Sequence, residues 1–173
     1  MMKISKFSTG SWTLAAMLLG MHVVHAASVS VPRFDLSALD GQRYTEEYLL
    51  GGPALVVFWA SWCPVCQVEL PKLNALFKDT KAGGLRVLAI GFADSEEKIR
   101  SYVRTHPDIF DFPVLYDPHD RVAKRFGVIG TPTIYLINRH GDIEYVTWLI
   151  EDPALMNKLR KLLDASQSTE RGS

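Results

Sequence analysis

The sequence predicts an α/β fold in which a central mixed sheet carries helices on both faces. Strand-like and helix-like patterns alternate along the 173 residues, which is typical of parallel strands joined by crossover helices. Residues 54–60 form an unbroken apolar run rich in β-branched and aromatic side chains, as expected of a strand buried on both faces. Two strand-like runs at 133–137 and 143–149 follow each other directly, so they add an antiparallel pair.

An N-terminal hairpin is expected to precede this sheet. Residues 34–39 and 42–44 flank Asp40-Gly41, a dipeptide that favours hairpin turns. A short helix is expected at residues 45–50. The Gly-Gly-Pro sequence at 51–53 should end it before the first buried strand begins.

The longest helical pattern begins directly after that buried strand. Apolar residues recur at helical spacing from Pro64 to about Asp79. Proline suits the first turn of a helix, so Pro64 is expected there, whereas Pro71 lies in the interior and should kink the helix. Gly83-Gly84 should end it.

The second half continues the alternation. Ser95 is expected to cap a helix that runs to about His106. Pro153 is expected to open a last amphipathic helix that ends near Leu163, because proline is favoured at the first helical position. The remaining expected elements are strands at residues 85–92 and 112–116 and a short helix at residues 120–126.

The N-terminus has the pattern of a secretory signal peptide. Lys3 and Lys6 precede an acid-free apolar stretch that ends in small residues. We expect cleavage after Ala26, which leaves one domain over residues 27–165 and a flexible tail over residues 166–173. The expected location is the periplasm. The alternative is an uncleaved inner-membrane anchor at residues 12–24, although a span needs about 20 mostly apolar residues.

Charge and cysteine usage narrow the classes of function. The formal net charge is zero, and loss of residues 1–26 makes it slightly negative. This balance does not suggest binding to nucleic acid or to an anionic membrane. The chain has two cysteines, Cys63 and Cys66. A disulfide between these two cysteines would close a very short loop and would add little stability through chain entropy. The pair therefore calls for a chemical explanation.

The position of Cys63 between a buried strand and a helix predicts a reactive thiol. Its sulfur is expected at the positive end of the helix, near unpaired backbone N–H groups that stabilise a thiolate. Because only a thiolate attacks a disulfide, Cys63 is the predicted nucleophile. Cys66 lies one turn further in on the same side. It is predicted to resolve the mixed disulfide by forming the Cys63–Cys66 disulfide.

Two separated motifs resemble the thioredoxin superfamily. They are FWASWCPVC at residues 58–66 and GVIGTPTIYLI at residues 127–137. Within that superfamily they are similar to the motifs of the exported TlpA/ResA-like thiol-disulfide oxidoreductases. The resemblance covers roughly residues 34–163 and implies a thioredoxin-like three-layer fold. Residues 95–117 match the helix-strand unit that this subgroup has inserted into minimal thioredoxin.

The resemblance also implies residues around the cysteines. The Thr131–Pro132 bond is expected to be cis and to face the pair, where Thr131 backbone groups can pair with an extended substrate. Thioredoxin carries a buried acid where this chain has Val57. Glu69 matches the acid that follows the motif in the ResA-like group, so it is expected to exchange protons with Cys66. A helix glutamate that merely faces water is the alternative interpretation.

Two tryptophans bracket the motif. Trp59 is expected in the core, whereas Trp62 is expected to form an exposed apolar lip against which substrates rest. Pro64 is counted with Trp62 among the residues that contact substrate. The Pro64-Val65 pair places no imidazole beside the thiolate, which favours a moderately reducing couple.

Three alternatives remain open. A Cu(I) metallochaperone could use the two thiolates because Cu(I) is a soft ion, but we expect His106, His119 and His140 in solvated loops. A peroxiredoxin usually has threonine where this chain has Ala60. If the protein had a purely structural role, replacing Cys63 with serine would leave its function intact. We expect no cofactor and no bound metal, since a zinc site would require two further ligands.

The sequence therefore predicts an exported thiol-disulfide oxidoreductase that reduces disulfides of specific client proteins. In this interpretation Cys63 attacks, Cys66 resolves and Glu69 handles the proton. The resemblance implies a membrane thiol-electron donor of the DsbD/CcdA type, since the periplasm is kept oxidising. It also implies a client in cytochrome c maturation or copper-site assembly. We expect a monomer that binds no nucleic acid.

Overall fold

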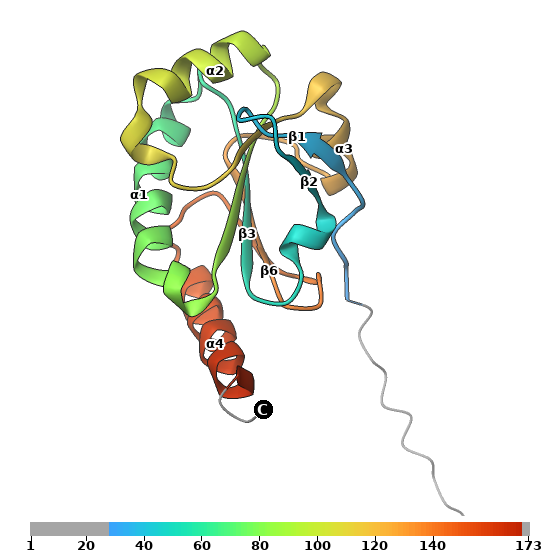
Figure 1. Cartoon of the computed structure of the whole chain (residues 1–173), viewed down its shortest axis with the longest axis vertical. Helices are drawn as coiled ribbons and strands as arrows, with labels where there is room; N and C mark the ends of the chain where they lie inside the picture. The colour runs from blue at the N-terminus through green and yellow to red at the C-terminus, as the bar shows by residue number, and fades with distance from the viewer. Residues whose placement is uncertain (1–27, 171–173) are drawn as a thin grey trace, which may run out of the picture.

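A five-stranded mixed sheet runs through the middle of the computed structural model, which describes residues 28–170 (Figure 1). The strand order is β5-β4-β3-β6-β7. β4 is parallel to both β3 and β5, and β6 is antiparallel to both β3 and β7. The strands are β3 (Ala54–Trp59), β4 (Arg86–Gly91), β5 (Val114–Tyr116), β6 (Thr133–Ile137) and β7 (Ile143–Thr147). The predicted α/β fold class is confirmed.

The central strand β3 is buried on both faces because its side chains alternate between two apolar clusters. Leu55, Val57 and Trp59 belong to the cluster that also contains side chains of α1 (Pro64–Thr80), α2 (Glu96–Thr105) and α4 (Pro153–Glu170). The other three side chains of β3 belong to the cluster with α3 (Arg121–Phe126) and the 3₁₀ helix η1 (Glu46–Leu49). Figure 1 shows α1 and α3 on opposite sides of β3 and β6, so the predicted three layers are confirmed.

The predicted N-terminal hairpin is present. β1 (Asp35–Ser37) pairs antiparallel with β2 (Arg43–Thr45), and Gly41 in the turn has a φ of 91°. Ala38 forms a bridge to Leu115, which attaches the hairpin to the β5 edge of the main sheet. The short helix expected after the hairpin is η1.

Three start and stop signals act as predicted. Pro64 opens α1, which also contains Pro71. A 3₁₀ turn, η2 (Lys81–Gly83), follows the helix, and Gly84 adopts a left-handed conformation with a φ of 87°. Ser95 caps α2, because its side chain accepts a hydrogen bond from the Lys98 N–H at 3.3 Å. Two further 3₁₀ turns are η3 (Pro107–Ile109) and η4 (Pro118–Asp120).

The ends of α4, β7 and β5 are among those that differ from the prediction. α4 continues to Glu170 instead of ending near Leu163. The Ser166 and Ser168 hydroxyls donate to carbonyls four residues earlier, so these polar residues satisfy their side chains within the helix. β7 ends at Thr147 instead of residue 149, because the backbone then turns away from β6. β5 begins at Val114 instead of residue 112, since Pro113 has no N–H to donate.

Parts of the prediction fall outside the described residues. They are the signal peptide at 1–26, the alternative anchor at 12–24 and the last three residues of the tail. Within residues 28–170, none of the helices has the length and apolar character needed to cross a membrane.

Gly91 offers a test of the packing between β4 and α2. A Cβ atom at this position would lie 2.8 Å from Ile99 Cδ1 and 3.0 Å from Ile99 Cγ1. Ile99 is fully buried, so it cannot swing away into solvent. We expect Gly91→Ala to lower the free energy of unfolding by about 1–3 kcal/mol. Urea unfolding of the oxidised protein, followed by circular dichroism, measures this change.

Gly130→Ala is the matched control for that measurement. A Cβ atom at Gly130 would meet nothing within 4 Å, and its φ is not positive. This variant should unfold at nearly the wild-type urea concentration. Equal stabilities of the two variants would contradict the close packing at Gly91.

Candidate active site

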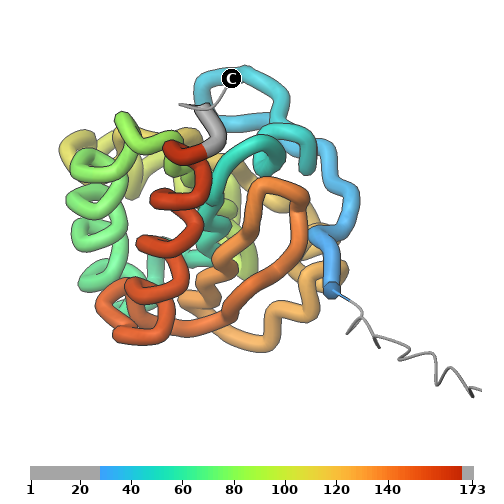
Figure 2. The backbone as a smooth tube through the Cα atoms, turned by 90° about the horizontal axis from the view of Figure 1, so that it is seen from below, coloured from blue at the N-terminus to red at the C-terminus, as the bar shows by residue number. Residues whose placement is uncertain are grey.

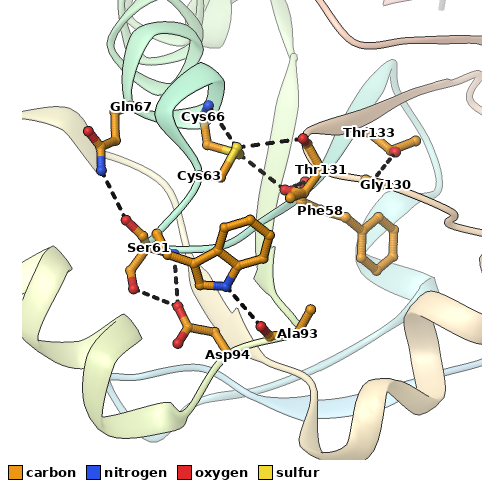
Figure 3. Close-up of a disulfide and its surroundings, with 11 residues drawn as sticks. Phe58, Ser61, Cys63, Cys66, Gln67, Ala93, Asp94, Gly130, Thr131 and Thr133 are labelled. Carbon is orange, nitrogen blue, oxygen red and sulfur yellow. Dashed lines mark hydrogen bonds between the residues drawn. A yellow bond between two sulfur atoms is a disulfide. The ribbon is translucent and has the colours of Figure 1, made fainter.

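Cys63 and Cys66 form a disulfide at the N-terminal end of α1 (Figure 3). Cys63 is the N-cap residue of the helix, and its Sγ accepts a hydrogen bond from the Cys66 N–H at 3.1 Å. Both side chains are almost completely buried. The first turn of α1 contains no acidic residue. The sulfur of Cys63 therefore lies where backbone N–H groups favour negative charge.

The loop before β6 faces the disulfide. The Thr131–Pro132 bond is cis, as predicted. The carbonyl oxygen of Thr131 lies 3.5 Å from Cys63 Sγ, and its hydroxyl oxygen lies 3.1 Å from Cys66 Sγ (Figure 3). Thr131 thus touches both sulfurs, with an acceptor beside Cys63 and a hydroxyl beside Cys66. Thr131 is partly buried and Pro132 is buried.

A second loop holds the segment that precedes Cys63. The Asp94 carboxylate, after β4, accepts hydrogen bonds from the N–H and the hydroxyl of Ser61 at 2.9 and 2.5 Å (Figure 3). The indole N–H of Trp62 donates to the Ala93 carbonyl at 2.9 Å. These bonds fix the backbone that leads from β3 into the disulfide.

The two tryptophans lie as predicted. Trp59 is fully buried and packs on Tyr102 and Phe110. Trp62 keeps 56% of its surface exposed although its indole N–H is bonded. Pro64 is also exposed. Trp62 and Pro64 therefore offer apolar surface beside the disulfide.

Glu69 is buried, with 4% of its surface exposed, so the interpretation of a glutamate that merely faces water is wrong. Its Oε2 accepts a hydrogen bond from the Ile150 N–H at 2.7 Å. Its Oε1 accepts one from Lys72 Nζ at 3.1 Å, and Lys72 also pairs with Glu151 at 2.8 Å. Glu151 and Glu69 together raise the pKa of Lys72.

Cys66 and Glu69 line the same small void under α1. The other lining side chains are apolar and include Val57, Pro132 and Ile150. Val57 is the position where the resemblance implies an acid in thioredoxin. Glu69 thus supplies the carboxylate that lines this void. We call the void the Cys66–Glu69 void.

Sequence reasoning missed Asp94, Ser61, Lys72 and Ile150. A signal for Asp94 was available, because parallel strands place their carboxyl ends at one edge of the sheet. Ser61 follows β3 and Asp94 follows β4, so this rule places the two at the same edge of the sheet. The Ile150 contact carries no such signal, since it uses a backbone N–H far from Glu69 in the sequence.

The histidines weighed as metal ligands lie on other elements. His106 ends α2 and stacks on Tyr102, His119 is in η4, and His140 is in the β6–β7 turn. Within residues 28–170, no group of three or more His, Cys, Asp or Glu side chains is arranged to hold a metal ion.

Proteins with related sequences carry names from thiol-disulfide chemistry. The thiol:disulfide interchange protein DsbE of Tatumella citrea is 33% identical over 145 residues, which cover 78% of this chain and 76% of that protein. The thiol-disulfide oxidoreductase ResA of Bacillus thuringiensis subsp. konkukian is 28% identical over 112 residues. That match covers 65% of this chain and 64% of the relative, which is less than two thirds of its length.

A solved structure supports the same grouping. The crystal structure of a putative thiol:disulfide interchange protein DsbE from Chlorobium tepidum superposes with a TM-score of 0.68 at 27% identity, covering 80% of this chain and 96% of that one. Residues 28–146 match the AhpC/TSA family. The chain therefore belongs to the AhpC/TSA family and is a ResA/TlpA-like member of the thioredoxin superfamily.

Proposed function

We propose that this protein is an exported thiol-disulfide oxidoreductase that reduces disulfides in specific client proteins. The observation that carries the proposal is the Cys63–Cys66 disulfide at the start of α1, opposite Thr131 and the cis Pro132. The named activities of the DsbE and ResA relatives support the same chemistry.

The reaction transfers two electrons from the reduced protein to the client. The Cys63 thiolate attacks one sulfur of the client disulfide, and the other client sulfur leaves as a thiolate that takes up a proton. The Cys66 thiolate then attacks the Cys63 sulfur of the mixed disulfide, which releases the second client thiolate. The protein is left with the Cys63–Cys66 disulfide. A membrane dithiol donor of the DsbD/CcdA type reduces it again.

The geometry supports different proposed tasks for the two sulfurs. Cys63 is the N-cap of α1, and the Cys66 N–H already points at its sulfur, so a thiolate at Cys63 is stabilised without rearrangement. Cys66 is fully buried and is bonded to Cys63, so a client disulfide cannot approach it from solvent. Cys63 is therefore the proposed nucleophile and Cys66 the resolving cysteine.

Glu69 is the proposed proton carrier for Cys66. Both side chains line the Cys66–Glu69 void, whose other lining residues carry no ionisable group. A resolving thiol must lose its proton before it attacks, and a carboxylate in the same void can accept that proton.

The same proposal includes where the protein works and which residues contact the client. The N-terminal pattern supports export to the periplasm, with the chain from residue 27 to the end of α4 at Glu170 as the working domain. Trp62, Pro64, Thr131 and Pro132 contact the client. The family resemblance supports a client in cytochrome c maturation or copper-site assembly and a monomeric protein.

A trapping experiment tests the order of attack. Cys66→Ser should accumulate its client as a mixed disulfide, because Cys63 attacks and nothing resolves the product. Cys63→Ser should trap nothing. Non-reducing electrophoresis of periplasmic extracts, followed by mass spectrometry of the captured bands, identifies the client. Capture by Cys63→Ser but not by Cys66→Ser would reverse the assignment of nucleophile and resolving cysteine.

Glu69→Gln tests the proton carrier. Glutamine keeps an oxygen that can accept the Ile150 N–H, but it cannot take up a proton. We expect reduction of a disulfide peptide to slow by about 100-fold, the lower end of the usual contribution of a general acid or base. Stopped-flow measurements across a pH series follow the rate. Glu97→Gln, on the exposed first turn of α2, is the control. An unchanged rate and pH profile in Glu69→Gln would remove Glu69 from proton transfer.

A further inference from the structure

Exposed apolar side chains are concentrated around the disulfide. Within residues 28–170, nine large apolar side chains are exposed, and two of them, Val29 and Leu50, lie outside the segments that border the site. Three segments carry the other seven: Trp62, Val65 and Val68 around the cysteines, Ile129 before Thr131, and Val146, Trp148 and Leu149 before Ile150. A concentration of this kind marks an interaction surface.

The same three segments carry no charge. Residues 60–68, 127–136 and 145–150 contain no Asp, Glu, Lys or Arg, although 22% of the whole chain is charged. The charged residues that follow two of these segments, Glu69 and Glu151, both pair with Lys72. A charged client segment would therefore lose hydration here without gaining an unpaired ionic partner. The surface therefore suits an uncharged, apolar segment.

The loop between β7 and α4 carries two adjacent exposed side chains of this surface. Trp148 and Leu149 are 62% and 51% exposed. The next residue, Ile150, is buried and lines the Cys66–Glu69 void together with Pro132. Figure 2 shows the segment that leads into α4 beside the first turns of α1. We call Trp148 and Leu149 the second lip, with Trp62 as the first.

Hydrogen bonds hold the second lip at both ends. On the β7 side, the Asp152 carboxylate accepts from the Thr147 hydroxyl at 2.8 Å and from the Tyr145 hydroxyl at 3.1 Å. Donation by Thr147 and by the Ala154 N–H lowers the pKa of Asp152. On the α1 side, the Ile150 N–H donates to Glu69. The two apolar side chains are thus displayed on a fixed support and are not part of a free loop.

We propose that the second lip selects clients whose cysteines are flanked by uncharged apolar residues, and that Glu69 positions this lip. The inference rests on the proposed oxidoreductase function and adds the substrate class. Such a segment would lie between the lips while Thr131 pairs with its backbone. Glu69 acts here through Ile150, so it is a positioning residue for the client in addition to its proposed role towards Cys66.

Three disulfide probes test the proposal. The first is a peptide with a Cys-Gly-Gly-Cys disulfide flanked by Leu and Phe, the second is the same peptide flanked by Ser, and the third is glutathione disulfide. We expect the wild-type protein to reduce the Leu/Phe peptide with a kcat/KM about tenfold above that of the Ser peptide, mainly through a lower KM. Trp148→Ser and Leu149→Ser should each remove most of this preference. Their rates with glutathione disulfide should stay at the wild-type level.

The control variant is Val29→Ala, which removes exposed apolar surface away from the site and should keep the preference. Glu69→Gln keeps an acceptor for Ile150, so it should keep the preference while it slows all three probes. Glu69→Ala removes the acceptor and should lose the preference as well as the rate.

The outcomes separate the two proposals. Equal kcat/KM for the two peptides, or an unchanged preference in both lip variants, overturns the second lip as a selector. An unchanged preference in Glu69→Ala overturns the positioning role of Glu69. If the wild-type protein reduces none of the three probes, the oxidoreductase function fails and this inference fails with it.

Discussion

The junction between β3 and α1 is the constraint on which the site depends. β3 is buried on both faces and cannot shift, so the chain leaves the sheet at a fixed place and starts the helix within a few residues. The first N–H groups of any helix lack partners within it and need an acceptor. Serine, threonine, aspartate or asparagine usually supplies it. Here the sulfur of Cys63 does so, and the contact that caps the helix is also the contact that stabilises a thiolate.

Glu69 connects the disulfide helix to a distant part of the chain. A buried carboxylate is tolerated only when hydrogen bonds replace its hydration, and Ile150 and Lys72 provide them. The same carboxylate lines the void beside Cys66. Any proton that it accepts from Cys66 competes with these bonds, because protonation weakens an oxygen as an acceptor. The two proposed roles of Glu69, proton exchange with Cys66 and positioning of the second lip, therefore use the same carboxylate.

Much of the fold was predictable because local patterns and tertiary contacts agree. The apolar run of β3, the Ser95 cap and the Pro153 start all act through neighbouring residues. The end of α4 was not predictable from polarity, since Ser166 and Ser168 satisfy their hydroxyls within the helix. Within the site, the cysteines and the cis proline follow from motifs. The bond between Glu69 and Ile150 depends on how α4 is placed against α1, which no local pattern encodes.

Thr131 gives the two sulfurs opposite surroundings, and this difference bears on how a thiolate at each sulfur is stabilised. Its carbonyl oxygen beside Cys63 cannot donate a hydrogen bond, so it offers no support to a thiolate there. Its hydroxyl beside Cys66 can donate to a thiolate at that sulfur. Cys63 therefore depends on the helix terminus, whereas Cys66 depends on a side chain of the facing loop. In the proposed reaction, a client segment that pairs with the backbone of Thr131 would occupy the acceptor beside Cys63. The Thr131 hydroxyl would stay beside Cys66, the proposed resolving sulfur.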